Sequence, residues 1–443
     1  MDSVFWLQVA VVLLCIAIGG RLGGVGLGAT GGLGVCLLVL GFGLPPGSPP
    51  ISVLLIIIAV ISCTSILQGS GGLDLLVHWA DRLLRACPRA ITFTGPLVSA
   101  LFVMLAGTAY VAFAIYPVIA EVATSVKVRP ERPLSASVIC AGIGVMASPM
   151  SAAMAAMVGI MSVYQIPFWQ ILAVTIPTYV LACLCAALSV YRRGRELEED
   201  HEFVRRVNSG EFTWLGQSHS TQVGGDHRKA LTGVVIFIAG ILIAILLGSI
   251  PGARPSWIDG TGRTVQLSIP NLIQMVMLAT GFFIIIACRI PPYKFADGSV
   301  FRAGLIGVVG VFGIAWCTGT FLDAHTAVIS NAFTYIAQQT PFLFCFAAFA
   351  VSTIVFSPTV TTTIMIPLGL KCGLPPEFLI GTWACCFGDF IIPGGAQIGC
   401  TAFDRTGTTH LGSFVINHSY LRPGLVFVTC GTLIGWLISR VVF

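Results

Sequence analysis

Long apolar segments separated by short polar loops run along the whole chain, and most have the length of one transmembrane helix, about 20 residues. The predicted single spans are about Val4–Gly20, Gly24–Phe42, Ile51–Gln68, Phe168–Tyr191, Leu231–Ile250, Leu272–Cys288, Phe301–Phe321 and Pro423–Val442. Four further apolar segments are interrupted by Gly, Pro or Ser residues. These interrupted segments decide which fold we expect.

The first of them, Ile91–Ser125, is interrupted at Gly107-Thr108. As one helix it would be roughly 52 Å long, whereas the hydrocarbon core of a bilayer is about 30 Å thick. Basic loops flank it on both sides, with Arg85 before it and Arg129 after it, and basic loops favour the cytoplasmic face. We therefore expect a re-entrant hairpin, two half-helices that enter and leave by the same face.

Three other segments repeat this kind of interruption. Leu134–Tyr164 is broken at Ser148-Pro149, and Glu377–Phe403 is broken between Gly388 and Gly395. Proline within a helix removes a backbone hydrogen bond, so we expect two broken spans. The segment Pro341–Cys372, interrupted around Ser357-Pro358, is too long for one crossing and is predicted to form a second re-entrant hairpin.

The order of these segments predicts an all-α polytopic membrane protein with two inverted halves. Residues 1–191 form the first half, residues 192–229 a polar cytoplasmic linker, and residues 230–443 the second half. Each half has five spans, one of them broken, and a re-entrant hairpin. Because five is odd, the halves have opposite orientations, the inverted repeat of many secondary transporters. With the amino terminus outside, only Arg254, Arg263, Lys371 and Arg440 of the 23 Lys and Arg residues fall outside.

Composition excludes a soluble protein. The chain is 56% hydrophobic and 9% charged, and the net charge of +5 resides in loops between apolar segments, where it sets topology and does not indicate nucleic-acid binding. The 15 cysteines are scattered through apolar segments without the paired spacing of a zinc site. We expect no metal, no cofactor and no disulfide framework.

The four interruptions predict the substrate site. In inverted-repeat carriers the broken helices meet near the bilayer midplane, where their amino termini offer free N–H groups to an anion. The predicted substrate-binding residues are Gly107, Thr108, Ser148, Pro149, Ser357, Pro358, Thr359, Asp389, Pro393, Gly394 and Gly395. Further hydroxyl candidates are Ser151, Thr361 and Thr362. One helix end supplies at most about 2 kcal/mol, so several must converge to hold a dianion.

Other polar residues leave alternatives open. An Asp at the bilayer centre costs about 2.5 to 3.5 kcal/mol to insert, so we expect Asp389 to have a role there. It either takes part in binding or caps its half-helix. Asp323 and His325 follow a span directly and are expected at the interface. The glycines of the second span, among them Gly28 and Gly31, indicate either a dimer contact or close packing within one chain. Leu73–Arg85 has the pattern of an amphipathic interfacial helix.

Several strings of residues closely resemble the anaerobic C4-dicarboxylate transporter (Dcu) family. They are Leu67-Gln68-Gly69-Ser70-Gly71-Gly72-Leu73-Asp74, Arg129-Pro130-Glu131-Arg132-Pro133, Ala147-Ser148-Pro149, Gly313-Ile314-Ala315-Trp316 and Phe403-Asp404-Arg405-Thr406-Gly407-Thr408-Thr409-His410-Leu411-Gly412. The resemblance covers nearly the full length. It implies a bacterial inner-membrane carrier that exchanges fumarate, malate or aspartate for succinate, with both termini outside, and in some members an influence on a partner sensor kinase.

The chain departs from the family pattern at the interruptions. Gly107-Thr108-Ala109-Tyr110 stands where the family has Gly-Thr-Gly-His, and Phe356-Ser357-Pro358 stands for Asn-Ser-Gln. The family's Pro-Thr-Tyr-Pro-Ser-Asp becomes Pro393-Gly394-Gly395-Ala396-Gln397, which lacks the acid, and Gly142 replaces a glutamine. The scaffold is retained while the presumed site differs.

The prediction from sequence is a homodimeric carrier of a dicarboxylate that works by alternating access and performs no covalent chemistry. A carrier of another organic anion and a membrane-embedded co-sensor that binds the ligand and signals to a partner are alternatives. Cation-coupled uptake in place of exchange is a third. An intramembrane enzyme using Asp389 or His325 is disfavoured, because no nucleophile, base or metal-ligand spacing accompanies them.

Overall fold

A computed structural model gives the fold of the chain. It describes residues 3–22, 25–49, 51–107, 109–149, 151–209, 226–250, 252–258, 260, 262, 264–325, 340–355, 358–393, 395–411 and 417–443. Nearly all regular structure in these residues is helical, in agreement with the expected all-α class.

The first part of the chain follows the predicted order of segments closely. Its helices are α1 (Ser3–Leu22), α2 (Val25–Cys36), α3 (Ile51–Gly69), α4 (Gly72–Ala86), α5 (Ile91–Ala106), α6 (Tyr116–Ser125), α7 (Glu131–Ile143), α8 (Ala152–Met161) and α9 (Phe168–Val190). A π-helical turn, Leu37–Gly41, extends α2, and a 3₁₀ turn, Ala109–Ala114, joins α5 to α6. The expected interruptions thus separate α5 from α6 and α7 from α8.

The second part repeats this order after a short linker helix. Its helices are α10 (His201–Asn208), α11 (His227–Ser249), α12 (Ile269–Cys288), α13 (Ser299–Ala324), α15 (Pro341–Val355), α16 (Pro358–Lys371), α17 (Pro376–Gly381), α18 (Gly395–Thr401) and α19 (Leu421–Val442). A 3₁₀ turn, Trp383–Cys386, follows α17. A small antiparallel hairpin of β1 (Ser256–Ile258) and β2 (Thr264–Gln266) was not predicted, because its strands have three exposed residues each and show no alternation of apolar and polar positions.

Six helical segments within the described residues are long and apolar enough to cross a membrane, and a seventh candidate is the bent pair formed by α3 and α4. Five of the six are expected spans, and α9 and α19 are among them. The segment Pro88–Ala106, which contains α5, also meets the length criterion, although the sequence places it in a hairpin. The chain is a multi-pass membrane protein, and the count of ten spans stays a prediction.

Glycines allow two helices of different halves to approach at backbone distance. A Cβ atom on Gly28 of α2 would lie 2.1 Å from the carbonyl oxygen of Val309 in α13, and one on Gly31 would lie 2.2 Å from the carbonyl carbon of Gly313. Any larger residue would force the helices apart. Of the two roles left open for these glycines, the structure shows close packing within one chain.

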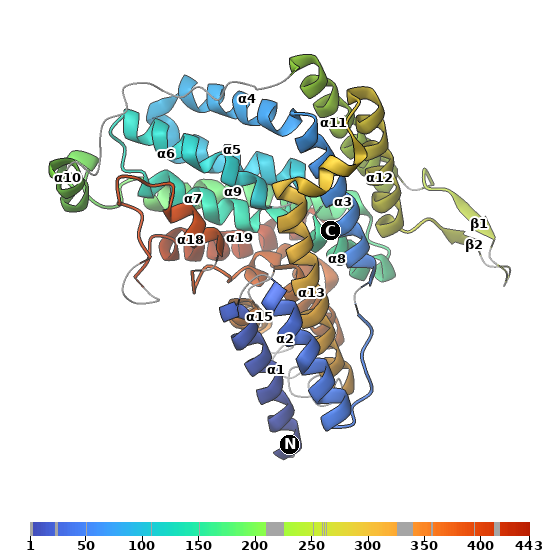
Figure 1. Cartoon of the computed structure of the whole chain (residues 1–443). Helices are drawn as coiled ribbons and strands as arrows, with labels where there is room; N and C mark the ends of the chain where they lie inside the picture. The colour runs from blue at the N-terminus through green and yellow to red at the C-terminus, as the bar shows by residue number, and fades with distance from the viewer. Residues whose placement is uncertain are drawn as a thin grey trace.

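Equivalent helices of the two parts pack in matching ways. The helix α2 lies along α13, while α3 lies along α12, and α9 lies along α19. Figure 1 shows α1 and α2 beside α13 in the lower part of the molecule, with α4, α5 and α6 layered above. A small apolar core joins α1, α2, α13 and α16, and includes Ile16, Leu38 and Ile314. A much larger core holds the remaining helices together.

The helix α4 turns away from α3 by 76° at Gly71, whose φ of +78° falls in the left-handed region. Leu75 and Leu84 of α4 are buried, whereas Leu83 is exposed. This bend and the two-sided character of α4 agree with the expected amphipathic helix. Its depth in the bilayer stays a prediction.

Candidate functional site

The first hairpin folds back on itself. The helix α5 ends at Gly107, which has a φ of +72°, and α6 returns beside it. Arg85 lies just before α5, and its Nη2 atom contacts Oε1 of Glu121, in α6, at 3.0 Å. Arg85 is in the last turn of α4, so this ion pair joins α4 to α6, and the turn Pro88–Ala90 at the start of α5 also packs on α6.

The first broken span is joined to the end of this hairpin by a hydrogen bond. The hydroxyl of buried Ser148 donates to the carbonyl oxygen of Met104, in the last turn of α5, at 2.8 Å. Ser151 accepts a hydrogen bond from the backbone N–H of Met154 at 2.9 Å and donates to the carbonyl oxygen of Val145. Ser151 thus satisfies a free N–H of α8 and a carbonyl of the turn before the break.

The second hairpin and the second broken span are in similar contact. Gly388 lies so close to α15 that a Cβ atom there would be 2.5 Å from the hydroxyl of Ser352. The indole N–H of buried Trp383 donates to the hydroxyl of Thr362, in α16, at 2.9 Å. In both halves the break therefore lies against the hairpin that precedes it in sequence.

Contacts between the halves bring the two sets of breaks together. The helix α8 of the first broken span packs on α16 of the second hairpin. The helix α18 of the second broken span packs on α7 and on the turn Ala109–Ala114 of the first hairpin, where a Cβ atom on Gly399 would meet the ring of Phe113 at 2.6 Å. The hairpin of each half therefore packs on the broken span of the other half, and the convergence of the predicted site residues stays a prediction.

The predicted site residues can be placed individually. Gly107, Ser148, Pro149, Pro358, Thr359, Asp389, Pro393 and Gly395 lie at the ends of the half-helices described above. Thr108, Ser357 and Gly394 lie outside the described residues. Asp389 lies in the stretch between Cys386 and α18 and is partly buried, and Thr359 lies in the first turn of α16 and is also partly buried. Pro358 begins α16, where its missing N–H costs no hydrogen bond.

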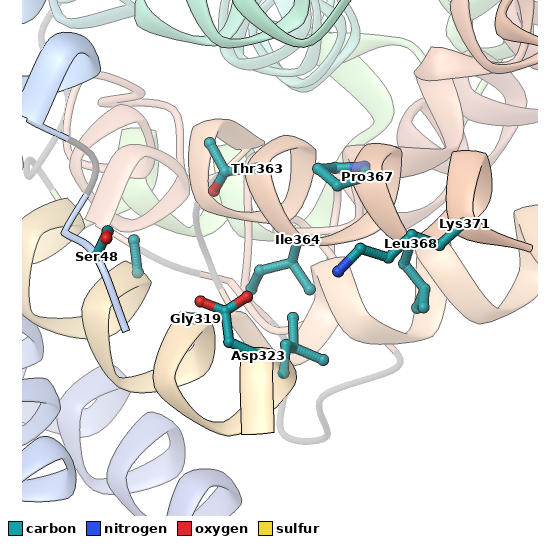
Figure 2. Close-up of a pocket in the computed structure, with 10 residues that line it drawn as sticks. Ser48, Gly319, Asp323, Thr363, Ile364, Pro367, Leu368 and Lys371 are labelled. Carbon is teal, nitrogen blue, oxygen red and sulfur yellow. The ribbon is translucent and has the colours of Figure 1, made fainter. Parts of the chain in front are cut away.

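A cavity of about 230 Å³ borders the second hairpin. It lies between α13, α16 and the loop that contains Ser48, and Figure 2 shows the charged ends of Asp323 and Lys371 pointing into it. Thr363, also at the cavity, is one helical turn beyond Thr359, so both hydroxyls lie on the same side of α16. The cavity therefore extends from the end of α16 towards the break that precedes it.

Lys371 was not among the residues predicted for a site, because it was counted only as a charge outside the membrane. Two features of the sequence could have indicated this cavity. Lys371 lies at the end of the second hairpin, and the acid Asp323 follows a predicted span. Asp323 is exposed, as expected for a position next to the interface. His325 contacts Oε1 of Gln8 at 2.6 Å and packs on Phe5, so it ties α13 to α1.

The buried charges around Glu131 were also not predicted from the sequence. Glu131 is 2% exposed and accepts a bond from the Arg129 Nε at 2.7 Å. It also accepts a hydrogen bond from the hydroxyl of Ser419 at 2.7 Å. Arg129 contacts the linker residue Asp200 at 2.6 Å, and Arg193 of the linker donates to the carbonyl oxygen of Ser419 at 2.7 Å. The linker, to which the sequence assigned no chemistry, is fastened to both halves at this point.

The family of anaerobic C4-dicarboxylate membrane transporters matches the chain over residues 4–443. The chain belongs to this family. It is 34% identical over 450 residues to the anaerobic C4-dicarboxylate transporter DcuB of Escherichia coli O6:H1, with 98% of each chain covered. It is 33% identical over 437 residues to the C4-dicarboxylate transporter DcuA of Wolinella succinogenes, with 98% of this chain and 99% of the relative covered. The resemblance identified from the sequence motifs is confirmed.

These relatives are transporters, so the chain is a transporter and not an enzyme. Among solved structures, MtrF of Neisseria gonorrhoeae, a member of a class of antimetabolite efflux pumps, aligns with a TM-score of 0.53 and 14% identity. The alignment covers 98% of this chain and 94% of MtrF. It shows a shared fold.

Proposed function

We propose that the chain is a carrier of the bacterial inner membrane that exchanges C4-dicarboxylates, fumarate, malate or aspartate against succinate, by alternating access. The substrate binds where the two hairpins and the two broken spans meet. The observation that carries this proposal is the pair of crossed contacts, α8 on α16 and α18 on the turn Ala109–Ala114. They support a common site at the half-helix ends of both halves, because recognition of a dianion requires several helix ends.

The chemistry of this site is that of helix ends and hydroxyls. Ser148 and Thr359 lie beside breaks, where backbone N–H groups lack helical partners and can bind a carboxylate. Asp389 is an acid within the second break, and its neutralisation by a proton or a cation is one way to couple transport to an ion. Lys371 at the neighbouring cavity attracts a dianion before it reaches the break.

The proposal includes the topology. Residues 1–191 and 230–443 form inverted halves with five spans each, the linker 192–229 is cytoplasmic, and both hairpins are re-entrant. The matching packing of α2 on α13 and of α3 on α12 supports a two-fold relation between the halves. The ion pair between Arg85 and Glu121 supports the return of the first hairpin to its own side.

Single cysteines test this topology in a background without the 15 native cysteines. Probes at Arg85 and Arg129 should both react with an impermeant thiol reagent only from the cytoplasmic side. If they react from opposite sides, α5 and α6 together cross the membrane, and the inverted halves are wrong.

Exchange is tested in proteoliposomes preloaded with succinate. Labelled fumarate, malate, aspartate and the larger anion citrate are offered outside, and empty vesicles serve as the control for exchange. Fumarate uptake that requires internal succinate supports the proposal. Fumarate uptake into empty vesicles that follows an imposed cation gradient indicates cation-coupled uptake.

A carrier of a different organic anion is the second candidate, favoured by the sequence of the breaks. This chain has Pro393-Gly394-Gly395-Ala396-Gln397 where the family pattern carries an acid. If no C4 acid exchanges while another anion does, the scaffold is the same and the site has a different selectivity. Association as a homodimer and with a sensor kinase are further proposals, tested by mass measurement in nanodiscs and by co-purification with the kinase.

A further inference from the structure

A second, polar cavity of about 500 Å³ lies between the linker helix α10 and the loop that follows α18. Arg206 borders it from α10, and Arg405, Gly407 and Thr409 border it from the loop. None of these residues belongs to the proposed transport site. The short helix α18 separates the cavity from the second break, a distance of about 10 Å for seven helical residues.

Arg206 is held in a fixed position at this cavity. Its Nη1 atom donates to the carbonyl oxygen of Arg405 at 3.0 Å, and its Nε atom donates to Glu202 at 2.8 Å. Gly407 has a φ of +77°, and a Cβ atom there would lie 2.5 Å from the guanidinium carbon of Arg206, so only glycine lets the arginine lie on the loop. Hydrogen bonds from Arg205 and Arg206 lower the pKa of Glu202 to about 2, so this anchor stays charged.

Within the part of the chain that the structure describes, the guanidinium of Arg405 and the hydroxyl of Thr409 have no hydrogen-bond partner. Arg405 is exposed, and its guanidinium makes no hydrogen bond or ion pair with any residue that the structure describes. Thr409 is 3% exposed, yet within the described part of the chain its hydroxyl has no hydrogen-bond partner. A buried hydroxyl without a partner is unfavourable, and a ligand in the cavity that bonded to it would remove this penalty.

The acid at this cavity makes its hydrogen bonds within its own loop and not to Arg405. Asp404 is 5% exposed, and its carboxylate accepts hydrogen bonds from the backbone N–H and hydroxyl of Thr406 and from the hydroxyl of Thr408 at 2.9 Å. The backbone N–H of Thr409 donates to it at 2.6 Å. The cavity is therefore bordered by two arginines and by Thr409, while the hydrogen bonds of its acid fold the loop.

We propose that this cavity binds a small oxyanion, a carboxylate or phosphate group, held by the guanidinium groups of Arg206 and Arg405 and by the hydroxyl of Thr409. Guanidinium forks match both kinds of group in geometry and charge. A bound anion joins the linker to the loop that continues from α18, so occupancy of the cavity holds this loop in place. The site is additional to the transport site and does not depend on which substrate is exchanged.

Calorimetric titration of the purified full chain in lipid nanodiscs tests the proposal. Succinate and inorganic phosphate are titrated separately at matched ionic strength, with chloride as a reference, so that the two sources of an oxyanion are distinguished. Arg405→Gln should weaken binding of one or both anions by roughly tenfold to a hundredfold, as expected for a lost charge-assisted bond. Thr409→Val should weaken it by roughly two- to tenfold.

Two features keep this test decisive. Arg205→Gln also removes one positive charge, from α10, but Arg205 pairs with Glu202 and does not border the cavity, so this variant should bind as the wild type does. Thr409→Val leaves no protein donor unpaired, so its thermal unfolding midpoint without anion should not fall. The proposal is overturned if Arg405→Gln and Thr409→Val bind both anions with wild-type affinity, or if Arg205→Gln weakens binding as much as Arg405→Gln.

Discussion

The two broken spans begin alike but differ in how their first turns are held. The helix α7 begins at Glu131, and α17 carries Glu377 in its first turn. Glu131 is buried in contact with Arg129 and Arg193, whereas Glu377 is partly exposed and forms no ion pair with a described residue. The first span is therefore anchored to the linker by buried charges, and the second is not.

The hairpins differ in the same sense. The first hairpin ends beside the ion pair of Arg85 with Glu121, whereas the second ends at Lys371, which borders a cavity. Corresponding segments of the two parts of the chain thus carry different polar chemistry. The first ends in an ion pair between helices, while the second ends beside a cavity. Substitutions at equivalent positions test this comparison.

The largest expected effect is at the beginning of the broken spans. Glu131→Ala leaves the charges of Arg129 and Arg193 without their buried partner and should lower the free energy of unfolding by about 3 to 5 kcal/mol. Glu377→Ala should change it by less than about 1 kcal/mol. Denaturant titration of both variants in the same detergent measures this. Equal losses would mean that the two helix starts are held equally.

The next effect is at the first break. Ser148→Ala removes the hydrogen bond that joins the break to Met104 and should lower the free energy of unfolding by about 1 to 3 kcal/mol. Ser148→Thr keeps the hydroxyl and is the matched control. Because the break belongs to the proposed site, the rate of succinate exchange in Ser148→Ala should fall more than the fraction of folded protein does. A parallel fall of both quantities would reduce Ser148 to a structural role.

A smaller effect is expected at the cavity of the second hairpin. Lys371→Gln removes a charge that attracts a dianion and should raise KM about fivefold at low salt, the equivalent of about 1 kcal/mol at high dielectric. High salt should screen most of the difference. Lys127→Gln is the control from the first hairpin, where the exposed lysine pairs with Glu198 of the linker at 2.5 Å. Equal KM values for both variants would show that the cavity takes no part in the approach of the substrate.

The smallest effect concerns the pair that closes the first hairpin. Arg85 and Glu121 are 31% and 42% exposed, and exposed ion pairs contribute about 0 to 1 kcal/mol. Glu121→Gln should therefore lower the free energy of unfolding by less than 1 kcal/mol, measured as above, while the cysteine probes keep their sidedness. A change of sidedness would make this pair a determinant of topology.

The sequence predicted the helices well because apolar length and Gly, Pro or Ser interruptions are local properties. It placed the breaks at Ser148-Pro149 and before α16, and both lie where expected. It did not reveal that Asp404 is buried and folds its own loop. Nor did it reveal the partners of Glu131, because Ser419 and Asp200 are distant in sequence and their approach depends on how the linker folds.

The sequence by itself determined that this protein is a membrane carrier with repeated helices. Hydropathy over 20-residue segments and the family motifs are local properties, so both can be read without the structure. Only the tertiary structure decided which breaks meet, which acids are paired and where cavities remain. The physical reason is that a half-helix end or a charge acquires its role from the groups packed around it. Those groups come from both halves and from the linker.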